Sequence, residues 1–207
     1  MTHIAFVTLE TPDAEAAERF YTDVFGLTDH IRVAESHEPT SGFRGFTLSL
    51  IVAQPSNADL YLTAAVEAGA EPLKPAKKSL WGYGGVVRSP DGVVWQVSTS
   101  QKKDTGKPSR EYDDVVLLLG VNDVADSKRF YVEHGLEVAK SYGRKYAEFT
   151  SPAEAVKLAL NNRRTLAKVA GVPAEGSGSH RLTIGTDTES FIDPDGFHWK
   201  AETQRIH

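Results

Sequence analysis

The chain has 207 residues, 40% of them hydrophobic and 25% charged, with a formal net charge of −5 and no cysteine. This composition is ordinary for a globular protein of one or two small domains, and it excludes disulfides, thiolate metal sites and cysteine nucleophiles. The negative net charge disfavours binding to nucleic-acid phosphates. Residues 1–15 lack the basic region of a signal peptide. No apolar stretch reaches the roughly 18 residues of a membrane span. We therefore expect a cytoplasmic protein with neither nucleic acid nor membrane as a partner.

Residues 1–100 predict one module that begins with a strand and a helix and ends with a hairpin. Four apolar residues recur at helical spacing from Ala17 to Val24, and Gly26 follows where such a helix would end. Segments rich in β-forming residues flank this helix, and a second helical pattern precedes the hairpin. The expected elements are a strand at 3–10, a helix at 12–25, extended segments at 29–36 and 43–53, a helix at 57–70, and hairpin strands at 82–89 and 93–100.

Residues 101–111, QKKDTGKPSRE, are polar and are interrupted by glycine and proline, so they predict a linker. Residues 112–207 then repeat the plan of the first module, with an insertion at 163–179 that has no counterpart there. The expected elements are a strand at 113–120, a helix at 123–134, extended segments near 137–150 and 156–162, a strand at 181–185, and hairpin strands at 189–193 and 197–202.

Two short motifs occur once in each module and in the same order. The helix carries Arg-Phe-Tyr followed by Gly-Leu, and Pro-Asp-Gly precedes the last strand, at 90–92 and again at 194–196. Proline and glycine suit the turn that joins two hairpin strands. The copies lie roughly 105 to 110 residues apart, far more than the period of a solenoid, so they indicate the duplication of one module.

This duplicated order of motifs resembles the vicinal oxygen chelate superfamily, which contains glyoxalases, bleomycin-resistance proteins, fosfomycin-resistance enzymes and extradiol dioxygenases. Residues 42–55 and 79–87 are most similar to uncharacterised actinobacterial glyoxalase-like proteins. The resemblance implies an α+β fold in which two tandem βαβββ modules form curved mixed sheets around a cleft. The modules pair either within one chain or across a homodimer, and the sequence leaves both arrangements open.

The resemblance also implies where metal ligands would stand, near the start of the first strand and on the last strand of each module. These positions fall on His3 and Gln96 in the first module and on Asp113 and Lys200 in the second. Imidazole and carboxylate are good ligands for zinc, iron or manganese, whereas an amide is a weak one and an ammonium is none. A lysine about 4 Å from a divalent metal would cost roughly 8 kcal/mol at an effective dielectric constant of 20.

We therefore favour a protein without a metal cofactor. The alternative is a divalent zinc, iron, manganese or nickel ion held by His3, Gln96 and Asp113. A slip of the last strand would bring His198 or Glu202 to the ligand position instead of Lys200. In a metal-free cleft, Asp113 and Lys200 would form an ion pair, or would face a ligand.

Aromatic residues beside the two hairpins supply the remaining candidates for ligand contacts. Trp81 and Tyr83 alternate with glycines, so rings and backbone can both approach a ligand. Trp95 and Trp199 occupy equivalent positions on strands whose alternation points them away from Gln96 and Lys200, so we assign them to the core. The ligand-binding residues predicted from the sequence are Trp81, Tyr83, Gln96, Asp113 and Lys200.

The function predicted from the sequence is the metal-free binding of a small aromatic or antibiotic-like molecule in the cleft, with no catalytic residue assigned. The alternative is a metal-dependent lyase, isomerase or dioxygenase that uses His3 and a carboxylate, with the metal polarising vicinal oxygens of the substrate.

Overall fold

The computed structural model describes residues 2–26, 30–153 and 155–201. Leu27 of the first Gly-Leu pair, the start of the segment predicted at 29–36, and Glu202 therefore lie outside the described residues. The helices are α1 (Ala14–Phe20), which continues into a π-helical segment η1 (Tyr21–Phe25), α2 (Pro55–Glu67), α3 (Val124–Glu133) and α4 (Arg163–Ala170). The strands are β1 (Ile4–Thr11), β2 (Ile31–Glu35), β3 (Thr40–Gly42), β4 (Phe46–Ile51), β5 (Glu71–Ser79), β6 (Gly82–Arg88), β7 (Val94–Thr99), β8 (Asp114–Val121), β9 (Val138–Ser141), β10 (Tyr146–Phe149), β11 (Lys157–Asn162), β12 (Gly176–Gly178), β13 (Leu182–Thr186), β14 (Phe191–Ile192) and β15 (His198–Ala201).

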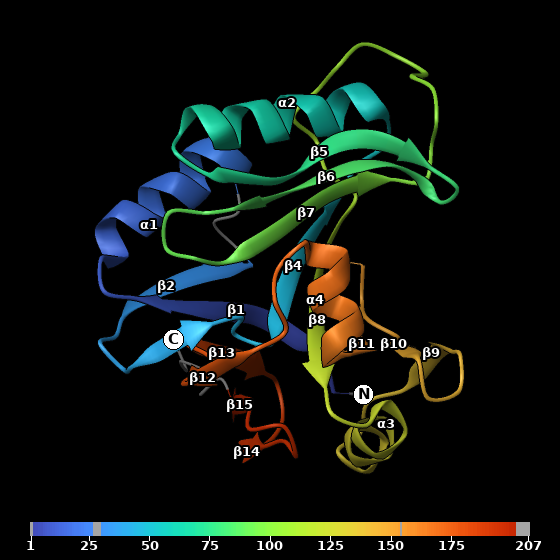
Figure 1. Cartoon of the computed structure of the whole chain (residues 1–207). Helices are drawn as coiled ribbons and strands as arrows, with labels where there is room; N and C mark the ends of the chain where they lie inside the picture. Colours follow the sequence, from blue (N-terminus) through green and yellow to red (C-terminus); the bar gives the residue numbers. More distant parts are fainter. Residues whose placement is uncertain (1, 27–29, 154, 202–207) are drawn as a thin grey trace, which may run out of the picture.

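Two mixed sheets form the body of the described chain, and each combines strands from both halves of the sequence (Figure 1). The larger sheet has the order β5-β6-β7-β4-β8-β11-β10-β9, and β4 and β8 join its halves in antiparallel register. The smaller sheet has the order β14-β15-β13-β1-β2, and β1 pairs antiparallel with β13. Strands between residues 46 and 162 therefore build the larger sheet, whereas strands within residues 4–35 and 182–201 build the smaller one. This mixed α+β architecture confirms the predicted fold class.

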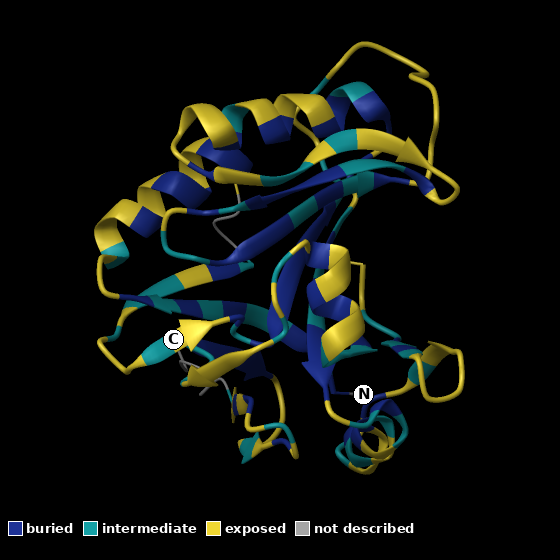
Figure 2. Cartoon of the chain, viewed as in Figure 1, coloured by how far each residue is buried: buried dark blue, intermediate teal, exposed yellow. Residues whose placement is uncertain are grey.

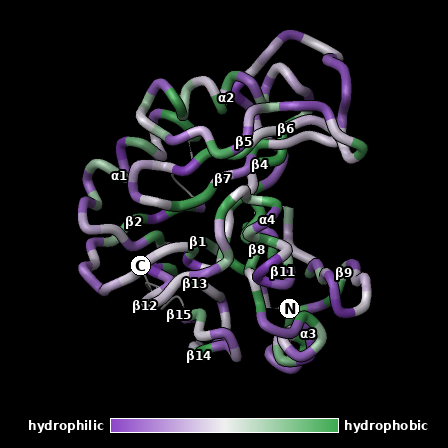
Figure 3. The backbone as a smooth tube through the Cα atoms, viewed as in Figure 1, coloured by the Kyte–Doolittle hydropathy of each residue, from purple (hydrophilic) through white to green (hydrophobic). Residues whose placement is uncertain are grey.

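The main core contains alternate apolar side chains of both sheets, and on the larger sheet it lies on the face covered by α2, which we call the outer face. Leu48, Trp95 and Leu117 stand opposite one another on β4, β7 and β8 and are fully buried. Figure 2 shows α2 buried where it faces the sheet and exposed on its far side, and Figure 3 shows hydrophobic residues concentrated along β8. Trp95 and Trp199 are 0% and 1% exposed, which confirms their assignment to the core.

In each module, the tyrosine of the Arg-Phe-Tyr motif contacts the segment that contains the Pro-Asp-Gly turn. The hydroxyl of Tyr21, from the first Arg-Phe-Tyr motif, donates to both carboxylate oxygens of Asp91 at 2.8 Å. Tyr131, its counterpart, donates to Asp193 beside the second Pro-Asp-Gly turn. Burial raises the pKa of both phenols well above the ordinary value, so both keep the proton that they donate. The tyrosine therefore fastens the helix to the turn that begins the last strand.

The predicted linker is tied to the start of α2 by one buried amide. The side chain of Gln54 accepts hydrogen bonds from the backbone of Thr105 (2.8 Å) and Gly106 (2.9 Å), and it donates to the carbonyls of Gly106 (3.2 Å) and Lys107 (3.0 Å). Because all of its polar atoms are bonded, Gln54 can be 3% exposed without an energetic penalty for lost hydration.

Candidate ligand-binding site

Helix α4, which lies in the insertion at 163–179, packs on the inner face of the larger sheet, opposite the core (Figure 1). Asn162 caps its first turn by accepting from the backbone of Arg164, and Gly171 ends it at φ 81°. Three of its side chains are buried, and they pack against residues of the sheet and of neighbouring loops, among them Phe43, Leu118, Val86 and Val94. The helix therefore fills part of the space that the inner face of the sheet would otherwise leave open.

A cavity of about 450 Å³ remains beside α4, between β5, β6, β7 and the end of the helix, and we call it the hairpin cavity. Its lining includes Trp81 at the tip of the β5–β6 hairpin, Gln96 and Ser98 on β7, and Val169 on α4. Trp81 is 85% exposed, whereas the other two tryptophans are buried. The cavity therefore joins an exposed aromatic ring to a polar floor.

Strand alternation decides which side chains of the hairpin face this cavity. Gln96 stands opposite Val86, and Ser98 opposite Gly84, so these positions share the inner face. Tyr83 stands opposite Thr99, on the other face, and its hydroxyl donates to Asp59 of α2 at 2.7 Å. Burial, followed by this bond to Asp59, raises the pKa of Tyr83 to about 12. The Tyr83 hydroxyl is therefore already engaged on the outer side.

The structure places the five ligand-binding residues predicted from the sequence in three regions. Trp81, Tyr83 and Gln96 all border the hairpin cavity. Asp113 is exposed just before β8, where its backbone N–H donates to Ile51 at 2.8 Å. Lys200 is exposed on β15 of the smaller sheet, opposite Gly185. Within the described residues no ion pair joins Asp113 to Lys200.

The residues considered as metal ligands do not form a donor set. The His3 imidazole lies 3.2 Å from the carboxylate of Asp187, so its Nδ1 is engaged beside the smaller sheet. Gln96 belongs to the larger sheet, whereas His3 lies beside the smaller one. In the described ranges, no three His, Asp or Glu side chains are grouped so that they could hold a metal ion. His198, the shifted candidate, is exposed on β15. These residues do not fit a metal centre.

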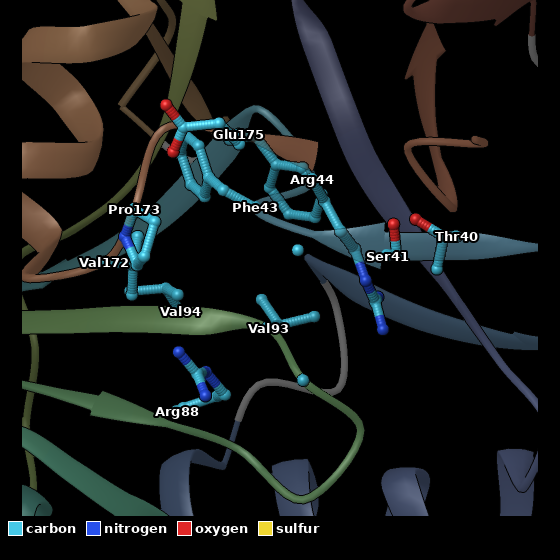
Figure 4. A pocket seen from close by; sticks show the side chains of 13 residues that line it. Thr40, Ser41, Phe43, Arg44, Arg88, Val93, Val94, Val172, Pro173 and Glu175 are labelled. Atoms are coloured by element: carbon cyan, nitrogen blue, oxygen red, sulfur yellow. The ribbon is translucent and has the colours of Figure 1, made fainter. Parts of the chain in front are cut away.

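A second cavity, of about 300 Å³, lies where the loop before β4 meets the β6–β7 turn and the segment after α4 (Figure 4). Arg44 and Arg88 line it. Arg44 donates to the carbonyl of Asp91, and burial lowers the pKa of its guanidinium from the ordinary value. Arg88 is paired with Glu71 at 2.9 Å. Apart from Gly92 of the first Pro-Asp-Gly turn, no sequence motif marks this cavity, because its walls come from segments about 45 and 80 residues apart that the folded sheet brings together.

The fold is shared with proteins of known structure. The chain superposes on glyoxalase I from Zea mays with a TM-score of 0.63 and 14% identity, over 97% of this chain and 92% of that one. It superposes on a candidate dioxygenase from Bacillus subtilis with a TM-score of 0.60 and 10% identity, over 98% of this chain and 85% of that one.

No protein-family model matches the sequence, and a comparison with curated proteins finds no match. Among the described residues, no helix is long and apolar enough to cross a membrane. At the identities given above, the likeness concerns the fold and leaves the activity open. The chain therefore has the fold of glyoxalase I, as the resemblance of its duplicated motifs implies.

Proposed function

We propose that this protein binds a small planar aromatic molecule in the hairpin cavity, without a metal ion. The observation that carries the proposal is Trp81, whose indole is 85% exposed at the rim of a cavity of about 450 Å³. Large aromatic side chains are seldom left in water, and a stacked pair of rings contributes about 0.5–1.5 kcal/mol beyond the burial of their surface. A flat ligand would cover the indole and fill the space beside it.

The polar groups of the floor would orient such a ligand. The amide of Gln96 both donates and accepts hydrogen bonds, and the hydroxyl of Ser98 does the same. Both stand on the inner face of β7, within the lining of the cavity. Asp113 and Lys200 lie outside this lining, so the proposal gives them no role.

The test uses 2-naphthamide, a neutral bicyclic ligand, and the three indole N–H signals of the chain in a ¹H–¹⁵N NMR spectrum. Trp95 and Trp199 are buried, so only the signal of Trp81 should shift on titration. We expect Trp81→Ala to weaken binding at least tenfold in calorimetry. Leu80→Ala is the matched control, because Leu80 is the adjacent residue and is 78% exposed but does not line the cavity. Unchanged affinity in Trp81→Ala would contradict the proposal.

The metal-dependent alternative is separated from this proposal by elemental analysis of the purified protein. Our proposal expects no stoichiometric zinc, iron, manganese or nickel, and binding of 2-naphthamide that is insensitive to chelators. One metal ion per chain, lost in His3→Ala together with a lyase, isomerase or dioxygenase activity, would replace the binding function by an enzymatic one.

A further inference from the structure

The charged side chains that line the hairpin cavity are positive. Its lining includes Lys74 and Lys77 of β5 but, among the described residues, neither an aspartate nor a glutamate. The chain as a whole carries a formal net charge of −5, so this cavity is a local cationic region on an acidic protein. A cavity lined by charges of one sign attracts ligands of the other.

Cross-strand register places the Lys77 side chain on the inner face. Lys77 stands opposite Gly84, which in turn stands opposite Ser98, and residues that face each other across antiparallel strands share one side of the sheet. Lys78 stands opposite Tyr83 and therefore points to the outer face. Gly84, between Lys77 and Ser98, leaves the floor between them free of a side chain.

Only one of the two lysines is free to bind a ligand. The ammonium of Lys74 donates to the carbonyls of Lys168 and Val169, both at 2.6 Å, at the end of α4. Lys77 has no hydrogen bond or ion pair within the described residues. Nearby acids are engaged on the α2 side, since Asp59 accepts from Tyr83 at 2.7 Å and Asp104 accepts from the backbone of Ser56 at 2.8 Å.

We infer that the ligand of the hairpin cavity is an aromatic carboxylate, bound with its ring against Trp81 and its carboxylate on the ammonium of Lys77. Hydrogen bonds to a charged partner are shorter and stronger than neutral ones, so the ammonium distinguishes an acid from its amide. Gln96 and Ser98 complete the anion's hydrogen bonds from β7. This inference rests on the proposed binding function and adds the chemical class of the ligand.

The experiment compares 2-naphthoate with 2-naphthamide, which have the same ring and differ in charge. By calorimetry we expect the wild-type chain to bind the carboxylate at least tenfold more tightly. Lys77→Gln should reduce that ratio to about one, while Lys78→Gln should leave it unchanged. Since both lysines are exposed and lie next to each other on β5, this control matches the substitution in strand, charge and exposure. Higher salt should weaken only the binding of the carboxylate.

The outcomes separate this inference from the function on which it rests. Equal affinity for the two ligands in the wild-type chain overturns the carboxylate assignment and leaves aromatic binding intact. A carboxylate preference that persists in Lys77→Gln overturns the role of Lys77. Binding of neither ligand overturns the proposed function and the inference together. Circular dichroism of each variant establishes that a lost affinity is not a lost fold.

Discussion

The two tyrosine–turn contacts have the same parts but different acceptors. In the first half, Tyr21 donates to Asp91, the aspartate within Pro-Asp-Gly, and its hydroxyl also lies 3.2 Å from that of Ser89. In the second half, Tyr131 donates to Asp193, which occupies the position of Ser89. The serine-to-aspartate difference before the proline therefore moves the acceptor by two residues.

Because Tyr131 donates to Asp193, the carboxylate of Asp195, the counterpart of Asp91, is available for other contacts. The Asp193 carboxylate also accepts from the backbone of Asp195 (2.9 Å) and Phe197 (2.8 Å). Asp195 in turn accepts from the backbone of Asn122 and the hydroxyl of Ser127, at 2.8 and 2.9 Å. The second turn is thus bonded to the residue before the N-cap of α3 and to the interior of the helix. The comparison teaches that a repeated motif can preserve a contact while exchanging the residue that makes it.

The largest difference that we expect between the halves concerns their buried tryptophans. Trp95 stacks on Phe25 with ring centroids 4.6 Å apart, in a strand between β4 and β6, whereas Trp199 lies on β15 beside the two-residue strand β14. A cavity in the centre of a sheet collapses less than one near its edge. We expect Trp95→Ala to cost about 5 kcal/mol and Trp199→Ala about 3 kcal/mol, measured by urea unfolding. Equal losses would show that the two sites are packed alike.

A smaller difference is expected when each tyrosine loses its hydroxyl. Asp193 is 4% exposed, whereas Asp91 is partly exposed and water can replace the lost donor. Removing the Tyr131 hydroxyl leaves the buried Oδ2 of Asp193 without its donor, although Oδ1 keeps its two backbone hydrogen bonds. Tyr131→Phe should therefore lower the free energy of unfolding by about 2 kcal/mol, and Tyr21→Phe by about 1 kcal/mol. Urea unfolding at neutral pH measures both, and the reverse order would refute our account of the acceptors.

The smallest expected effect is a pH dependence that belongs to the second half. Burial raises the pKa of Asp193 above its ordinary value, so the folded chain holds this proton more tightly than the unfolded chain. The stability contributed by Asp193 is therefore present below about pH 4 and declines as the pH rises through the raised pKa, with a slope of at most about 1.4 kcal/mol per pH unit. Subtracting the pH profile of Asp193→Asn from that of the wild type should isolate this decline. A difference that rises with pH would contradict it.

Much of the architecture could be predicted from local pattern. The helix expected at 123–134 is α3 (Val124–Glu133), and the strand expected at 113–120 is β8 (Asp114–Val121). The helix expected at 12–25 instead changes to a π-helical segment at Tyr21. Strand β5 was missed, because its prolines and charges hide the alternation that marks a strand. Comparison of the two modules does not identify helix α4, because the insertion that contains it has no counterpart in the first module.

The site was predictable only where its residues are local. Trp81 and Gln96 come together because β6, which begins directly after Trp81, pairs with β7, which carries Gln96. Gln96 and Lys200 are equivalent in the repeat but belong to different sheets, because the last quarter of the chain pairs with the first. Such pairing depends on contacts between residues far apart in sequence, which local motifs do not encode. The lysines of β5 could not be assigned to the cavity without the register of the strand.

The bond from Lys74 to the end of α4 has a consequence for ligand size. It fixes the helix against β5, and Gly171 allows the approach, because a Cβ there would lie 2.8 Å from the Lys74 side chain. The end of α4, through Val169, therefore completes one side of a hairpin cavity that the sheet otherwise lines. Relatives with a shorter or longer segment at this point would accept ligands of different dimensions on an unchanged scaffold, so selectivity could diverge by changing loop length alone.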